Sequence, residues 1–185
     1  MEEKKDNRST LRTRALIHEA YFALLKERDF SKISVAAIAE RAGINRGTFY
    51  AHYLDVRDLA MKLAEEALKD LATVLNRYDS RLFLRDPRPL LTDFLSFLES
   101  ARQKHDVKIS YSRANAFRDK LEAVLSDHLK DCFPDSQSDS VKAALQVHYM
   151  TSGIVNLFLK WIAGSLSCSR ELLIDTVADM VQGNH

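Results

Sequence analysis

The sequence has few of the residues that interrupt regular secondary structure. Its 185 residues include 5 glycines and 3 prolines. An all-β sandwich or barrel needs a turn about every 8–12 residues, and such turns depend on glycine, proline and short polar residues. The scarcity of glycine and proline therefore disfavours an all-β fold. The sequence also has no G-x-G-x-x-G or G-x-x-x-x-G-K motif, which excludes the usual signatures of phosphate-binding loops.

Cysteine and long apolar runs are scarce as well. Cys132 and Cys168 are the two cysteines, and they form no C-x-x-C motif. The N-terminal residues contain no apolar segment typical of a secretion signal, so we expect two reduced thiols in a cytoplasmic protein. The longest uncharged run, residues 143–159, contains polar side chains and falls short of the ~20 apolar residues that span a bilayer. We expect it to form a buried helix.

Signatures of catalysis are absent too. The sequence has no Glu-x-x-His pair, no H-E-x-x-H motif and no G-x-S-x-G motif. We therefore expect neither an enzyme nor a bound metal or cofactor.

Apolar residues recur at the spacing of helices along almost the whole chain. The periodicity predicts an all-α fold of about nine helices, without strands or internal repeats. The expected segments are 9–27, 35–42, 46–52, 55–78, a helix after 86–89 with its apolar stripe at 91–101, 106–114, 117–129, 140–163 and 169–181.

Helix boundaries are marked most clearly between residues 34 and 55. Ser34, Asn45 and Asp55 are good N-cap residues, because their side chains can accept hydrogen bonds from the free amides of a first helical turn. Gly43 follows the second segment, where helices often end in a left-handed residue. The sequence therefore predicts two short helices joined by Gly43-Ile44-Asn45, a tight turn of the helix-turn-helix type.

The two short helices have different residues on their two sides. Ile38, Ala39, Ala42, Phe49 and Tyr53 can pack against the first helix of the chain. The second short helix is left with a free face of Arg46, Gly47, Thr48, Tyr50, Ala51 and His52. A polar helix pair can simply be a solvated corner, but the core does not need an aromatic residue at position 50. Such a face suits the DNA major groove.

The run from Gly43 to Tyr53 closely resembles the signature of the tetracycline-repressor (TetR) family of transcriptional regulators, and the resemblance covers about Thr10 to Leu59. It implies a homodimer whose first three helices bind double-stranded DNA and whose remaining helices hold a small-molecule effector and the dimer interface. We accordingly expect a helix-turn-helix domain at 1–54, with an arm at 1–8, and a ligand-binding and dimerisation domain at 55–185.

The same resemblance implies roles for individual residues. Ser34, Thr48, Tyr50 and His52 would contact phosphates, and Arg46 and Ala51 would face bases, with Asn45 and Gly47 on the same surface. Family members commonly have a lysine at the start of the fourth helix, where this chain has Val56. The adjacent Arg57 is the candidate for that phosphate contact.

In the C-terminal part, candidate pocket residues are the polar and aromatic side chains within apolar helices. They are Arg102, His105, Tyr111, Phe117, His148, Tyr149, Ser152 and Asn156. The alternative is that these residues are hydrogen-bonded core or interface residues. The expected dimer interface comprises Val155, Leu159, Leu172, Val177 and Met180. His18 and His128, each isolated on an amphipathic segment, are expected at the surface.

The sequence thus predicts a ligand-responsive regulator, most simply a repressor, that is bound to a roughly palindromic operator and released by a small molecule. The alternative is a regulator-like coactivator or partner-binding module with weak DNA affinity of its own. The overall charge of +1 is modest for DNA binding. However, residues 1–54 contain 10 Lys and Arg against 7 Asp and Glu, whereas residues 55–185 contain 17 against 19. The positive charge therefore lies in the part expected to bind DNA.

Overall fold

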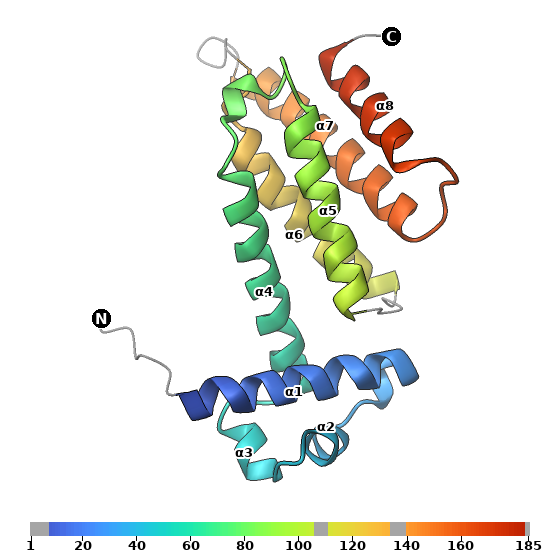
Figure 1. Ribbon diagram of the computed structural model, residues 1–185. Coiled ribbons are helices and arrows are strands. Elements are labelled where there is room, and N and C mark those ends of the chain that lie inside the picture. The colour runs from blue at the N-terminus through green and yellow to red at the C-terminus, as the bar shows by residue number, and fades with distance from the viewer. Residues whose placement is uncertain (1–7, 106–110, 134–139, 184–185) are drawn as a thin grey trace, which may run out of the picture. The chain divides into compact units, whose positions relative to one another are not determined.

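The computed structural model describes residues 8–105, 111–133 and 140–183, and these residues are helical without any strand. They form α1 (Arg8–Glu27), α2 (Val35–Ala42), α3 (Arg46–Tyr50), α4 (Val56–Leu75), α5 (Arg88–His105), α6 (Tyr111–Leu129), α7 (Ser140–Ile162) and α8 (Arg170–Gln182), with two short 3-10 helices at Phe30–Lys32 and Ser80–Leu82 (Figure 1). The all-α prediction is confirmed. Within the described part of the chain, no helix is both long and apolar enough to cross a membrane.

The expected helix boundaries differ from the structure by more than one residue in three places. The segments expected at 106–114 and 117–129 form one helix from Tyr111 onward, because no proline or glycine separates them. Residues 106–110 of the first segment lie outside the described part. The described residues therefore hold eight α-helices rather than nine. α3 and α4 end two and three residues earlier than expected, and each closes with a tighter turn, such as the 2.9 Å bond from the His52 amide to the Phe49 carbonyl.

The chain divides into two compact units. The first comprises Met1–Ala64 and Gln103–Ser110, and the second comprises Glu65–Arg102 and Tyr111–His185. α4 contributes residues to both.

The core of the first unit lies between α1, α2, α3 and the start of α4. From α1 it receives Ile17, Ala20, Tyr21 and Leu24, all at most 5% exposed. Leu16 lies on an overlapping apolar stripe of α1, but it is 37% exposed. The stripe through Ile17 has the same helical spacing and turns larger side chains inward, so packing selects it.

The second unit has a larger core, built from α5 to α8 and the later part of α4. Phe94, Leu121, Leu125 and Phe158 are fully buried in it. Figure 1 shows these helices gathered into a bundle.

Polar contacts join α5 to α8 along one side of this bundle. The Arg170 guanidinium donates to Ser96 Oγ (2.6 Å), the Thr92 carbonyl (3.2 Å) and Glu99 Oε2 (3.2 Å). At the first residue of α5, Arg88 forms ion pairs with Asp175 and Asp179 of α8. These contacts fix which face of α8 turns toward α5.

Candidate nucleic-acid interface

α2, the turn and α3 have the geometry of a helix-turn-helix, and local interactions account for each step. Ser34 Oγ accepts a hydrogen bond from the Ala37 amide (3.2 Å), which caps α2. Gly43 ends α2 with a φ of 67°, a conformation that glycine adopts without strain. Asn45 Oδ1 then accepts from the Thr48 amide (2.7 Å) and caps α3. All three boundary residues act as the sequence predicts.

α3 is attached to the first unit by its apolar side. Phe49 is fully buried, and Tyr53, just beyond the helix, is 2% exposed. Ile38 and Ala39 of α2 are buried as well. These residues pack in the same core as α1, which confirms the expected inner face.

The opposite side of α3 is exposed. Arg46, Gly47, Tyr50 and Ala51 all lie at the surface, and Tyr50 is 55% exposed. Thr48 and His52 are half-buried at the edges of this face. Within the part of the chain that the structure describes, the Arg46 guanidinium forms no ion pair or hydrogen bond. We call Arg46, Gly47, Tyr50 and Ala51 the outer face of α3.

The start of α4 follows α3 closely in the sequence. Asp55 Oδ1 accepts from the amides of Arg57 (2.7 Å) and Asp58 (2.8 Å), as expected of an N-cap. Val56 is 8% exposed and belongs to the core of the first unit, whereas Arg57 is exposed. Hydrogen bonds from the Leu54 amide and from Lys62 lower the pKa of Asp58 below its usual range. Among the described residues, Lys62 pairs with Asp58, whereas the exposed Arg57 guanidinium has no ion-pair partner.

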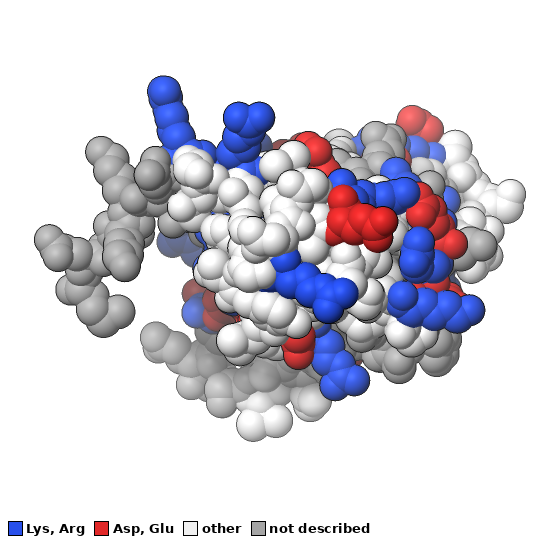
Figure 2. Space-filling model, turned by 90° about the horizontal axis from the view of Figure 1, so that it is seen from below, with Lys and Arg blue, Asp and Glu red and all other residues white. Residues whose placement is uncertain are grey.

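Basic side chains surround the region of α2 and α3. Figure 2, seen from below Figure 1, shows several Lys and Arg side chains spread over this view beside a smaller number of acidic ones. Some of the cations are paired: Arg41 of α2 lies 2.5 Å from Glu27 of α1. The pairing ties α1 to α2 and removes part of the positive charge from this surface.

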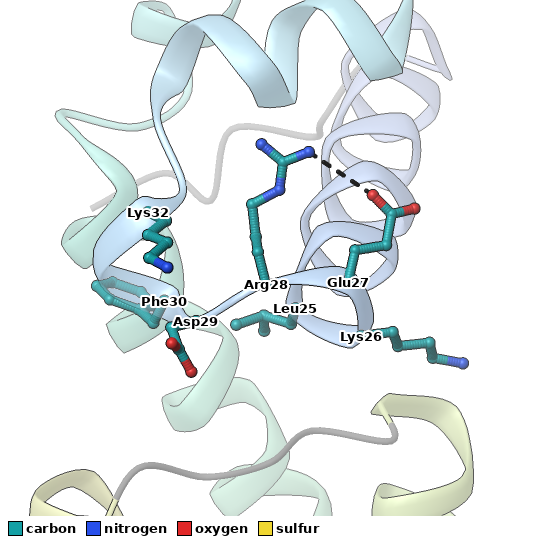
Figure 3. A pocket seen from close by; sticks show the side chains of 7 residues that line it. All are labelled: Leu25, Lys26, Glu27, Arg28, Asp29, Phe30 and Lys32. Carbon is teal, nitrogen blue, oxygen red and sulfur yellow. Dashed lines mark ion pairs between the residues drawn. The ribbon is translucent and has the colours of Figure 1, made fainter.

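A hollow of about 250 Å³ lies where α1 ends (Figure 3). Its lining is strongly charged and includes an ion pair of 3.7 Å between Arg28 and Glu27. The lining residues are Leu25, Lys26, Glu27, Arg28, Asp29, Phe30 and Lys32. None of the residues expected to line an effector pocket is among them, and the hollow belongs to the first unit.

The expected pocket residues lie at different depths in the second unit. His148 is exposed, and Tyr149, at 85% exposure, is among the most exposed apolar residues of the chain. Arg102 is exposed and donates to the Ile162 carbonyl. Phe117 packs against the core. The side chains of His105 and Tyr111 lie outside the described part.

Ser152 and Asn156 are half-buried on α7, and Ser152 Oγ donates to Glu122 Oε2 of α6 (2.8 Å). Thr151 is fully buried and bonds to Ser126 of α6 (2.8 Å). We did not predict a role for Glu122, Ser126 or Thr151. The available signal was that each is a polar residue next to the apolar stripe of an amphipathic segment. These polar contacts join α6 to α7.

The five expected interface residues divide into two groups. Leu172 and Met180 are 57% and 56% exposed. Val155 and Val177, at 0% and 2% exposure, are part of the second unit's own core, and Leu159 packs against that core. Helical periodicity placed all five on apolar stripes but does not distinguish a core residue from an interface residue.

Neither histidine expected at the surface is simply solvated. His18 Nε2 lies 2.7 Å from the Tyr53 hydroxyl, so it belongs to the packing between α1 and the turn after α3. His128 Nε2 is buried and has no hydrogen-bond partner among the described residues, and burial lowers the pKa of this imidazole. Both expectations were wrong, because tertiary packing decides how much of an amphipathic side chain is covered.

The described part of the chain favours neither a metal site nor a reactive thiol at Cys132. There, no group of three or more His, Cys, Asp or Glu side chains is placed to hold a metal ion. Both cysteines are free, and burial raises the pKa of Cys132 to about 11. A thiol with such a pKa stays protonated and unreactive near neutral pH.

Comparisons with known proteins agree with this geometry. The family model described as bacterial regulatory proteins of the tetR family matches residues 17–60, which include α2, α3 and the start of α4. YxbF, an uncharacterised HTH-type transcriptional regulator of Bacillus subtilis (strain 168), is 25% identical over 161 residues. The match covers 85% of this chain and 41% of YxbF, so the chain spans less than half the length of that relative.

Two solved structures share the fold over most of their length. A candidate TetR-family transcriptional regulator from Syntrophomonas wolfei is 16% identical, with a TM-score of 0.71 over 92% of this chain and 93% of that chain. The dihydroxyacetone kinase operon activator DhaS is 19% identical, with a TM-score of 0.60 over 92% and 94%. The family match and the shared all-helical fold lead to one conclusion: residues 17–60 are similar to the tetR-family helix-turn-helix, in a chain that has the fold of solved TetR-family regulators.

Proposed function

We propose that the chain is a ligand-responsive repressor that binds a roughly palindromic operator as a homodimer in the cytoplasm. The observation that carries this proposal is the outer face of α3, which is polar and aromatic while Phe49 holds the opposite side in the core. The proposal assigns DNA binding to residues 1–54 and effector binding and dimerisation to residues 55–185.

Phosphate contacts would set the register of α3 on the DNA. Ser34 stands at the N-terminus of α2, and Thr48 and His52 lie at the edges of the outer face. Tyr50 and Arg57 are exposed and take no part in the core, so their hydroxyl and guanidinium groups are available to phosphates. Asn45, as the N-cap, would orient the first turn of α3 toward the backbone.

Base recognition would depend on Arg46 and Ala51. An arginine can donate two hydrogen bonds to one guanine, and an alanine methyl can contact a thymine methyl. Gly47, between Arg46 and Thr48, has no side chain and would allow the α3 backbone to approach the DNA closely.

The experiment is selection of bound duplexes from random DNA, followed by affinity measurements on the recovered operator. Arg46→Ala should cost about 1–3 kcal/mol on the operator and relax specificity at one position of each half-site. Arg57→Ala should weaken binding to all duplexes alike and reduce the slope of log affinity against log salt by about 1. Arg77→Ala, an exposed arginine of the second unit, is the matched control and should change neither quantity.

Exposed apolar side chains on α7 and α8 support the homodimer. Val141, Leu145 and Tyr149 recur every four residues on α7 and are 65–85% exposed. Leu172 and Met180 on α8 are more than half exposed. Obligate dimer interfaces are apolar in this way, and a two-fold axis would place two α3 helices on successive turns of a palindromic site. Sedimentation at micromolar concentration tests this part, and a monomer would contradict it.

The effector would bind in the second unit, among the polar residues of α6 and α7. Ser152, which bonds to Glu122, and the half-buried Asn156 offer hydrogen-bonding groups within apolar helices. A useful effector must bind one conformation better than the other, with a coupling of typically ~1–3 kcal/mol. Because α4 is one continuous helix with residues in both units, we propose it as the connecting element.

The alternative function is a coactivator or partner-binding module with weak DNA affinity. It is favoured by the modest charge of +1 and by the fold shared with an operon activator. A salt series separates the two functions, because several phosphate contacts give a steep fall of affinity with salt. A flat salt dependence and micromolar affinity would favour the alternative.

A further inference from the structure

The buried Tyr53 hydroxyl makes a contact that the proposed DNA-binding role does not use. Tyr53 follows α3 and is 2% exposed, and its hydroxyl lies 2.7 Å from His18 Nε2 in the middle of α1. A phenylalanine would fill the same space in the core. The hydroxyl therefore adds a specific polar link between α1 and the turn after α3, and a buried hydroxyl needs such a partner.

The other side of Tyr53 is covered from α4. Lys62 Nζ lies 5.3 Å from the centre of the Tyr53 ring, donates to Asp58 Oδ2 (3.0 Å) and approaches the His52 carbonyl (3.4 Å). Asp58 in turn accepts from the Leu54 amide (2.9 Å). The turn between α3 and α4 is therefore held from α1 by His18 and from α4 by Lys62.

α3 needs such external support. It has five residues, little more than one turn, and helices of that length are unstable on their own. Phe49 is its one fully buried side chain. A helix attached at one point can still rotate about that point, so a second attachment fixes its orientation. Tyr53, whose ring centre is 5.7 Å from that of Phe49, supplies the second attachment.

We propose that His18, acting through the Tyr53 hydroxyl, is a positioning residue that fixes the orientation of α3 and thereby sharpens operator discrimination. The inference rests on the proposed use of the outer face of α3 to bind DNA. His18 itself makes no DNA contact in this proposal. Its effect is to narrow the range of angles at which Arg46 and Tyr50 are presented.

The test compares Tyr53→Phe, His18→Leu and the double variant in the full-length chain. His18→Gln is the conservative variant, because its amide can still bond to a hydroxyl. Tyr78→Phe is the matched control: it also removes a hydroxyl with a short hydrogen bond, 2.6 Å to Asp93, but in the second unit. For each variant we would measure hydrogen exchange of the α3 amides without DNA. We would also measure the ratio of affinities for the selected operator and a scrambled duplex.

Tyr53→Phe and His18→Leu should each speed exchange in α3 and lower the affinity ratio by roughly threefold to tenfold, the range of one hydrogen bond. The double variant should be no worse than either single one, since both remove the same link. His18→Gln should stay within about twofold of wild type, and Tyr78→Phe should leave α3 exchange and the ratio unchanged.

Unchanged α3 exchange in Tyr53→Phe, an unchanged affinity ratio, or additive losses in the double variant would each overturn the positioning role. A wild-type chain that binds no duplex would instead overturn the proposed function. The exchange measurement needs no DNA, so the two failures are told apart.

Discussion

The N-cap of α3 allows a quantitative test of how its local structure contributes to DNA binding. Asn45 Oδ1 accepts from the Thr48 amide (2.7 Å) and from the Thr48 hydroxyl (3.1 Å). Asn45→Ala removes this acceptor. Because the site is exposed, water can replace part of the lost hydrogen bonding, so we expect a cost of about 1 kcal/mol, near the middle of the range for N-caps. That corresponds to about a fivefold shift in the local opening equilibrium.

Two further substitutions at the same position separate capping from charge. Asn45→Ser keeps an acceptor without charge, so both α3 stability and operator affinity should remain near wild type. Asn45→Asp also caps well and places a negative charge at the helix N-terminus, which favours the helix. The same charge would face DNA phosphates, so this variant should bind the operator more weakly, most clearly at low salt.

Hydrogen exchange of the α3 amides measures the local stability, and titration with operator duplex measures the affinity. Asn45→Ala should exchange about five times faster. Because the closed form of α3 still predominates, its operator affinity should fall by less than fivefold. Trp161, the only tryptophan, lies in the second unit and bonds to the Cys168 carbonyl (2.9 Å), so its fluorescence should be unaffected. The reasoning would be refuted if Asn45→Ser behaved like Asn45→Ala, because the cap would then not depend on an acceptor.

Three further predictions concern the second unit. His128→Leu removes a buried Nε2 that lacks a partner within the described residues, and should add roughly 1 kcal/mol to the free energy of unfolding at pH 7. Because burial lowers the pKa of His128, the wild type should lose stability relative to this variant as the pH falls below about 6.5. In urea unfolding, the difference in unfolding free energy between variant and wild type should be larger at pH 5.5 than at pH 7.5. A smaller difference at pH 5.5 would refute the assignment. Arg170→Ala should cost about 1–2 kcal/mol in thermal unfolding, after allowance for its partial exposure. Arg170→Lys should not restore the loss, since one ammonium nitrogen cannot take the positions of both Nε and Nη2 of the guanidinium. Leu172→Asp should convert a dimer to a monomer in sedimentation, whereas Leu82→Asp, at an equally exposed position elsewhere in the second unit, should not; dissociation by both variants would argue against a specific interface.

The features predicted best from the sequence are those set by residues a few positions apart. Ser34, Gly43 and Asn45 mark the helix ends where the sequence places them, because a cap depends on its own side chain and the next three amides. The bounds of α2 agree for the same reason. The outer face of α3 followed from Phe49, whose burial determines the residues that remain exposed.

Features that depend on distant parts of the chain were not predictable in the same way. The choice between Leu16 and Ile17 as the buried residue of α1 depends on the shape of the surface opposite, and both stripes have helical spacing. The link from His18 to Tyr53 spans 35 residues, and no local pattern indicates it. Val155 and Val177 show the same limit, since an apolar stripe fits a core as well as an interface.

The division of α3 into one buried side chain and an exposed outer face bears on how this protein can change during evolution. Phe49 supports the fold, whereas Arg46, Gly47, Tyr50 and Ala51 do not contribute to the core. Exposed substitutions away from caps usually alter stability by no more than about 0.5 kcal/mol. Under the proposed function, mutations at Arg46, Tyr50 and Ala51 would therefore change which DNA sequences are bound while folding is preserved. Gly47 is more restricted, since an added Cβ would lie 3.2 Å from the capping oxygen of Asn45.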